Sequence, residues 1–425
     1  MVPVLLICLL VLFVVSAPIT VALGLSGFTA LLFGSDIDPM IVIQRLVGGI
    51  DSFSLMALPF FILSANLMAT GGLSKRLLDW CRALVGHVCG GIAMATELAS
   101  MFFGALSGSS PATIIAIGKL MYPDLVERKY PKKFIGGLLA SSGSVALIIP
   151  PSITIIIYCT VTGASVGKCF IAGITAGVLF GLSSLIYIYF YSRKLNLPRD
   201  KRSSLAELWR ATKKAFAALM VPVIILGGIY SGICTPTDAA AVSAVYAMIV
   251  GLFIYKEMTL KDLWKVLVDS AVGTAQVLVL MSSATILGWI LTVSNLSTTL
   301  TNVLLGDVTS KVLFLLIVNI ILLIFGMFMD GSASILIVAP LVFPMATAMG
   351  INPVHLCLIM ISNLAIGMYT PPFGMNLFVT SGITKQDMVE MLPGVWPFLA
   401  VNLASLLVIT YCPDLIMFLP NLAGG

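Results

Sequence analysis

Two clusters of small polar residues interrupt long apolar stretches of the chain. The first is Ser107-Gly108-Ser109-Ser110-Pro111 and the second is Asp330-Gly331-Ser332. Serine followed by proline favours a helix start, so we expect a helix over 111–122 whose N-terminus lies at the first cluster. The free N–H groups and partial positive charge of such an end suit a carboxylate. We expect Asp330 to cap the second helix, either as a cap alone or as a cap that also coordinates a cation.

Two proline pairs supply complementary chemistry. Pro150-Pro151 and Pro371-Pro372 each break an apolar stretch. Because proline lacks an N–H and disfavours helical geometry before it, nearby carbonyl groups lose their helical donors. Unwound backbone of this kind coordinates sodium in transporters, and a kink that only shapes a span is the alternative. The candidate oxygens belong to Ser109, Ser110, Ile149 and Pro151 in one set, and to Asp330, Gly367, Thr370 and Pro372 in the other.

The segments 107–158 and 330–379 have the same order of elements. In each, a polar tip is followed by an apolar stretch ending in proline (Pro123, Pro344), a connection, and a second apolar stretch with its proline pair. Helix breaks in a membrane survive only where protein or a water-filled cavity surrounds them. A matched pair, one in each half, is typical of a secondary transporter whose site lies between internal repeats.

The two connections differ in charge. Residues 124–133 include four Lys or Arg, whereas 345–354 include none. The positive-inside rule therefore predicts that the first hairpin opens to the cytoplasm and the second to the opposite side. We expect an all-α polytopic membrane protein with two inverted repeats, each containing a re-entrant helical hairpin and a Pro-Pro-broken helix. The repeats are expected at 1–205, with hairpin 92–122 and broken helix 134–163, and at 206–425, with hairpin 326–349 and broken helix 355–382.

Composition supports the membrane assignment. Of 425 residues, 59% are hydrophobic and only 10% charged, and the mean hydropathy is +1.11. Soluble chains are about 25% charged, so a soluble domain is excluded. The net charge of +5 gives no reason to invoke nucleic acid, and the eight cysteines show no zinc-ligand spacing. Further spans are predicted near 2–17, 19–33, 53–70, 166–191, 216–233, 236–255, 272–293, 312–328 and 394–412.

The most polar stretch, 193–214, is rich in Lys and Arg and is expected to be cytoplasmic. Ser204 and Glu207 have capping-box spacing. The helix that they start is predicted either to lie on the membrane surface or to be part of an ordinary charged loop, and the same holds for 259–267.

Few charged side chains fall inside the expected spans, and these are Glu97, Asp238, Asp330 and His355. Proton-driven carriers usually have relays of acidic residues and histidine in their spans. Their scarcity favours sodium over protons as the coupling ion.

Five motifs in order resemble the large membrane subunit of TRAP (tripartite ATP-independent periplasmic) transporters. They are SGSSPATIIAIG, LIIPPSI, CTPTDAAAVSAVYA, MDGSASILIVAPLVFP and GMYTPPFGMNLF. The resemblance implies an ion-transporter-type fold that moves as an elevator in the bacterial inner membrane. It also implies sodium-driven import of an organic acid, of the sialic acid or C4-dicarboxylate class. The partners implied are a periplasmic substrate-binding protein and a small four-helix membrane subunit on a separate chain, in contact with membrane lipid.

Carried over by motif, the family's sodium sites include each tip and its facing proline turn. The resemblance adds Ala146 to the first site and implies that the substrate lies near Ser107, Ser109 and Ser110. Two departures are Ala146, where the family often has glycine, and Asp238, where it more usually has glutamate.

Three other functions differ in the residues that they require. An intramembrane serine protease needs a general base near its nucleophile, and neither histidine lies in such a motif. A passive channel does not need paired broken helices. The serious alternative is a sodium-coupled carboxylate symporter of similar fold that acts without a binding protein.

Overall fold

The computed structural model describes residues 1–15, 17–34, 37–38, 40–294 and 310–423, which form helices and connections without any strand. Among these residues, eight helices are long and apolar enough to cross a membrane. The chain is therefore a multi-pass helical membrane protein, as predicted.

The elements of the first half are α1 (Val2–Val14), α2 (Ile19–Gly34), α3 (Met40–Gly48), η1 (Phe53–Met56), α4 (Ala57–Thr70), α5 (Leu73–Val85), α6 (Gly91–Ser107), α7 (Ser110–Glu127), α8 (Lys132–Ser142), η2 (Gly143–Leu147), α9 (Ile153–Thr162) and α10 (Val166–Lys194). The elements of the second half are α11 (Leu205–Tyr230), α12 (Pro236–Ile249), η3 (Val250–Ile254), α13 (Leu260–Val293), α15 (Lys311–Phe328), α16 (Gly331–Ala348), α17 (Pro353–Gly367), α18 (Met375–Thr384), α19 (Met388–Tyr411) and α20 (Pro413–Ala423).

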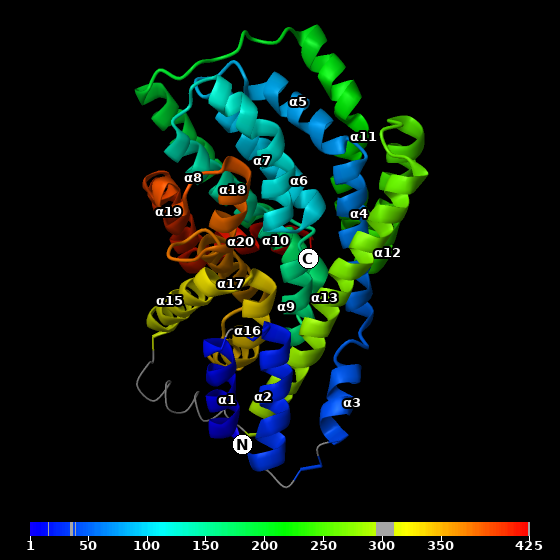
Figure 1. Ribbon diagram of the computed structural model, residues 1–425, viewed down its shortest axis with the longest axis vertical. Coiled ribbons are helices and arrows are strands. Elements are labelled where there is room, and N and C mark those ends of the chain that lie inside the picture. Colours follow the sequence, from blue (N-terminus) through cyan, green and yellow to red (C-terminus); the bar gives the residue numbers. More distant parts are fainter. Residues whose placement is uncertain (16, 35–36, 39, 295–309, 424–425) are drawn as a thin grey trace.

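Two helical hairpins, α6–α7 and α15–α16, contain the polar tips. Figure 1 shows α6 and α7 in the upper half of the molecule and α16 in the lower half, towards α1 and α2. Each hairpin is followed by a helix that ends at a proline pair, α8–η2 in the first case and α17 in the second. The basic connection between α10 and α11 lies at the same end as α5 and the outer ends of α6 and α7.

One boundary prediction was wrong. The first tip helix does not end at 122, because α7 continues past Pro123 to Glu127. The second hairpin was predicted to end at 349, and α16 continues past Pro344 and ends at Ala348, close to that position. Proline within a helix removes one hydrogen bond and kinks the helix without always ending it.

The segments predicted as surface helices are also different in the structure. The capping box of Ser204 and Glu207 is present, but it starts α11, which continues unbroken into the apolar stretch as far as Tyr230. Thr259 likewise caps the 34-residue helix α13. These polar turns are the ends of long helices, so no separate surface helix forms.

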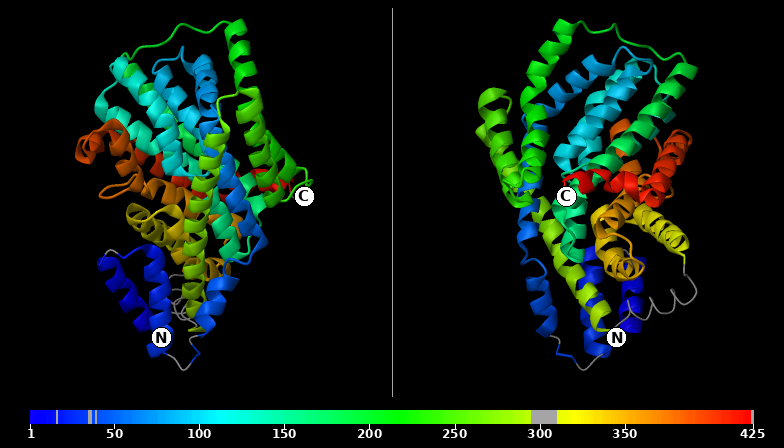
Figure 2. Two further views of the ribbon diagram at one scale, coloured as in Figure 1. Left: turned by 45° about the vertical axis from the view of Figure 1, so that its right-hand side comes forward. Right: turned by 180° about the vertical axis from the view of Figure 1, so that it is seen from behind.

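The long helix α13 connects distant parts of the molecule. Figure 2 shows it (yellow-green) running from the upper part of the molecule towards the end where the N-terminus lies. It packs against α2, α3, α4 and α16. It therefore forms one wall beside the second hairpin.

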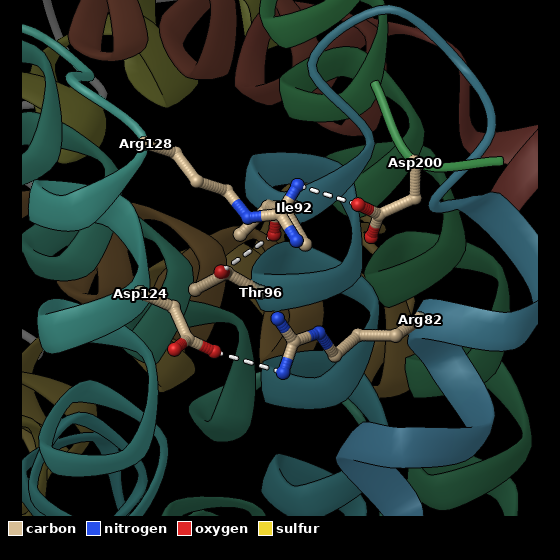
Figure 3. A network of polar contacts seen from close by, with 6 residues as sticks. All are labelled: Arg82, Ile92, Thr96, Asp124, Arg128 and Asp200. Atoms are coloured by element: carbon tan, nitrogen blue, oxygen red, sulfur yellow. Dashed lines mark hydrogen bonds and ion pairs between the residues drawn. The ribbon is translucent and has the colours of Figure 1, made fainter. Parts of the chain in front are cut away.

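Two ion pairs hold the outer end of the first hairpin (Figure 3). Arg82 of α5 contacts Asp124 of α7 at 2.8 Å, and Arg128 contacts Asp200 at 2.5 Å. Partly exposed pairs such as these contribute about 0–1 kcal/mol each. Their main effect is to connect α7 to α5 and to the segment after α10.

Candidate substrate and cation site

A cavity of about 320 Å³ lies where the two polar tips meet α13. Small-molecule sites usually fall between about 300 and 1,000 Å³, so this cavity suits a small organic ligand. Its walls come from both tips, from residues flanking both proline pairs, and from α13. The lining residues are Gly108, Ser109, Ser110, Pro111, Leu147, Ile153, Thr154, Gln276, Val277, Leu280, Asp330, Gly331, Ser332, Met368 and Met375.

The first tip is built around the start of α7. Ser109 is the N-cap residue and has extended backbone geometry, but its side chain makes no capping bond. The N–H groups of the first turn are therefore left for a ligand. Ser107 is buried and does not line the cavity, and its Oγ lies 2.9 Å from Oγ1 of Thr113. Of the three serines predicted to bind substrate, Ser109 and Ser110 line the cavity, whereas Ser107 contacts Thr113 of α7.

Gly108 allows the first tip to approach the first proline pair. Its φ is +58°, and a Cβ atom there would lie 3.0 Å from the carbonyl oxygen of Pro151. Both the left-handed backbone and the close contact favour glycine. This contact places the tip hydroxyl groups beside the carbonyl groups of the unwound segment.

The second tip is capped by Asp330, as predicted. One carboxylate oxygen, Oδ1, accepts from the N–H of Ser332 at 2.6 Å and from that of Ala333 at 3.3 Å. The other oxygen, Oδ2, has no hydrogen-bond partner within the described parts of the chain. Asp330 is the one charged residue among the described residues that line the cavity.

The first proline pair leaves carbonyl oxygens without partners. The Pro150-Pro151 peptide bond is cis. Ser152 donates to the carbonyl of Leu147 and caps α9 through the N–H of Ile155. The carbonyls of Ile149 and Pro151 accept no hydrogen bond from any residue that the structure describes. They therefore have lone pairs free for a cation.

The second proline pair is more exposed. Pro371-Pro372 is also cis, and Pro372 lies at an exposed position while Thr370 is buried. The N–H of Thr370 donates to the carbonyl of Gly367 at 3.0 Å, and its hydroxyl donates to that of Ile366 at 2.7 Å. The Gly367 carbonyl therefore keeps one free lone pair, and the Thr370 hydroxyl oxygen can still act as a ligand.

Matching helix crossings hold the two proline segments. A Cβ atom on Gly104 would lie 2.8 Å from the Cα of Ala146, and one on Gly326 would lie 2.9 Å from the Cα of Gly367. In both cases the helix that enters the tip crosses the helix that precedes the prolines at backbone contact. Ala146 and Gly367 therefore occupy corresponding positions at the two crossings. The first crossing accommodates the methyl group of alanine, whereas the second has glycine.

Asn376 connects the two halves of the site, and sequence reasoning missed it. Its Oδ1 accepts from the Ser110 hydroxyl at 2.9 Å, and its Nδ2 donates to the Ala140 carbonyl at 3.0 Å. Its N–H donates to the carbonyl of Met368 at 2.8 Å. One buried amide thus joins the first tip, α8 and the second proline segment. Its place in GMNLF, directly after a proline break, was the only available signal.

Gln276 of α13 was also missed. It lines the cavity opposite the tips, although it is 54 residues before Asp330 in a helix that reads as an ordinary span. A polar side chain within an apolar helix was the available signal. Ala146, Ile149, Pro151, Gly367, Thr370 and Pro372 do not line the cavity and lie in the segments behind it.

Comparison with known proteins identifies the family of this chain. Residues 6–415 match the family model described as the DctM component of the tripartite ATP-independent periplasmic transporter. The C4-dicarboxylate TRAP transporter large permease protein DctM of Pseudomonas aeruginosa is 43% identical over 95% of this chain and 94% of its own. The sialic acid TRAP transporter large permease protein SiaM of Vibrio cholerae is 35% identical over 90% of each.

The fold is shared more widely. The solved structure of the Alcanivorax borkumensis YdaH transporter superposes with a TM-score of 0.60 at 17% identity, covering 88% of this chain and 89% of that one. Its similarity concerns the fold alone. The family match and the two permease relatives together show that this chain belongs to the DctM family of TRAP transporter large permeases, which are transporters and not enzymes.

Proposed function

We propose that this chain is the membrane permease of a sodium-driven carrier that imports an organic acid across the bacterial inner membrane. The relatives act on C4-dicarboxylates and on sialic acid by name, and both classes carry carboxylates. The cavity between the tips matches this chemistry because the unpaired N–H groups at the start of α7 face it.

The sodium proposal rests mainly on the negative charge of Asp330 in the cavity lining. An anionic substrate in a cavity whose single charged lining residue is a carboxylate would be repelled. A cation bound to the free Oδ2 removes that repulsion, so substrate and cation bind best together. Binding of each then favours the other, as coupled transport requires.

The available oxygens suit two cation sites. We place the first among Ser109, Ser110 and the carbonyls of Ala146, Ile149 and Pro151. The close approach of Gly108 to Pro151 supports it. We place the second among Asp330 and the oxygens of Gly367, Thr370 and Pro372, of which Gly367 and Thr370 are buried and Pro372 is exposed.

Transport by an elevator follows from this assignment. The first tip, α8 and the second proline segment are joined by hydrogen bonds of the buried Asn376 of α18. A unit connected in this way would move as one body against α13. The inverted repeats, 1–205 and 206–425, would then expose the site to each side in turn.

Reconstitution tests the function. Proteoliposomes containing this permease and a small membrane subunit, supplied with the periplasmic binding protein and labelled malate or sialic acid, should accumulate one of the acids only under an inward sodium gradient. Accumulation that needs sodium but not the binding protein would support the symporter alternative. Accumulation driven equally by a proton gradient without sodium would refute sodium coupling.

A further inference from the structure

A second cavity, of about 480 Å³, continues from the first along the same three helices. On α13, residues 276–280 face the first cavity and residues 281–292 face the second. On α9, Ile153 and Thr154 face the first, and Thr160 to Thr162 face the second. The helix α16 likewise starts at the first cavity and lines the second with its later turns. The two cavities therefore share walls and succeed each other along one path.

The second cavity lies away from the basic end of the molecule. It is lined by the later turns of α13 and by α3, which Figure 1 shows towards the end where the N-terminus lies. The basic connections 124–133 and 193–214 lie at the other end. By the positive-inside rule the second cavity is on the side from which substrate arrives in the proposed function.

Arg45 is the one charged residue among the described residues that line this cavity. Its guanidinium lies 5.3 Å from the ring centre of Trp289 on α13, a cation–π contact that limits its orientation. The end of α3 is fixed nearby, because Ser282 donates to the carbonyl of Leu46 at 2.6 Å. No acidic group in the described ranges lies within ion-pair distance of Arg45.

The threonine hydroxyls of the cavity do not compete with Arg45 as donors, and the indole N–H of Trp289 is a single neutral donor beside it. The hydroxyls of Thr285 and Thr292 donate to carbonyls of their own helix. Those of Thr160 and Thr162 do the same on α9. A hydroxyl whose hydrogen is already used offers only acceptor lone pairs. An anion in this cavity would thus be recognised by the guanidinium, which has several donors in a planar fork.

We propose that the second cavity is an outer binding chamber for the carboxylate substrate, with Arg45 as the group that holds it before it reaches the tips. The inference rests on the proposed function. The two cavities then have opposite charge, positive at Arg45 and negative at Asp330. An acid is attracted into the outer chamber, and it moves on favourably once a cation neutralises Asp330.

Trp289 provides a measurement that does not depend on transport. The assembled permease is placed in nanodiscs of phosphatidylcholine, and its tryptophan fluorescence is titrated with malate and with sialic acid. Trp289→Phe identifies the part of the signal that comes from the chamber. We expect a saturable response to at least one acid, weakened about tenfold in Arg45→Gln and largely kept in Arg45→Lys, since a charge-assisted hydrogen bond is lost in the first variant only.

Lys168→Gln is the matched control. It removes one positive charge from an exposed position at the start of α10, outside the lining of the chamber. Its titration should match that of the unmodified protein. In proteoliposomes, Arg45→Gln should raise the KM for uptake about tenfold with little change in kcat, because the chamber acts before the tips.

The outcomes separate the two proposals. An Arg45-dependent Trp289 response without sodium-driven uptake supports the chamber and refutes the function. Sodium-driven uptake with an unchanged KM and an unchanged Trp289 response in Arg45→Gln overturns the chamber alone. A second set of nanodiscs replaces part of the phosphatidylcholine with phosphatidylglycerol. A Trp289 response to that replacement, with none to either acid, assigns Arg45 to lipid headgroups and also overturns the chamber.

Discussion

Replacing Asp330 by asparagine separates its structural role from its charge. Asparagine and aspartate are about equally good N-caps. The side-chain oxygen of asparagine can keep the bonds to the N–H groups of Ser332 and Ala333, at 2.6 and 3.3 Å. The start of α16 should therefore be retained, while the negative charge facing the cavity is lost.

The expected loss of sodium affinity can be worked from the geometry. A cation about 3 Å from a carboxylate interacts by about 5 kcal/mol at an effective dielectric constant of about 20. Desolvation of both ions offsets about half of this or more. The remaining 1.4–2.8 kcal/mol, roughly, corresponds to a ten- to hundredfold higher sodium concentration for half-maximal uptake.

The assay is the sodium dependence of initial uptake in proteoliposomes, with the thermal stability of the purified variants measured in parallel. Asp387→Asn is the control, since Asp387 caps α19 at an exposed position through the N–H of Val389 at 3.1 Å. It should leave sodium dependence unchanged. Asp330→Ala should add a stability loss of about 1 kcal/mol because the cap is also removed. An unchanged sodium half-saturation in Asp330→Asn, with normal stability, would refute the coordinating role.

Three further predictions concern the tips and the segments that contact them. Gly108→Ala should impair transport strongly, because φ is +58° and the new Cβ would lie 3.0 Å from the carbonyl oxygen of Pro151. Gly163→Ala is the control: at φ +74° with open space around it, it should cost about 1 kcal/mol of stability and leave transport intact. Asn376→Leu should destabilise the protein by about 2–4 kcal/mol, because it leaves buried polar groups unpaired. A double-mutant cycle with Ser110→Ala should show a coupling energy of about 1 kcal/mol. Purely additive effects on thermal unfolding would contradict the hydrogen bond between Ser110 and Asn376. Thr370→Val should raise the sodium half-saturation several-fold while preserving fold and expression, and an identical sodium curve would remove Thr370 from the second site.

Local chemistry allowed much of the fold to be predicted. Proline pairs and polar tips within apolar runs are strong local signals, because lipid cannot satisfy a broken helix. For the same reason the cap at Asp330 and the capping box at Ser204 were found correctly. Helix ends were less predictable: the first tip helix was expected to end at 122, next to Pro123, but α7 packs against neighbouring helices and continues to Glu127.

The amino-acid sequence by itself determined the class of protein, the two tips and the residue types available to bind a cation, since these depend on local propensity and on hydrophobicity. Only the tertiary structure decided which distant groups meet. Asn376 lies 266 residues from Ser110, and Arg45 and Trp289 are 244 positions apart, so no periodicity could pair them. Gln276 lines the cavity and Ser107 does not for the same reason: the surroundings of a side chain depend on how its helix packs, and packing is a property of the whole fold.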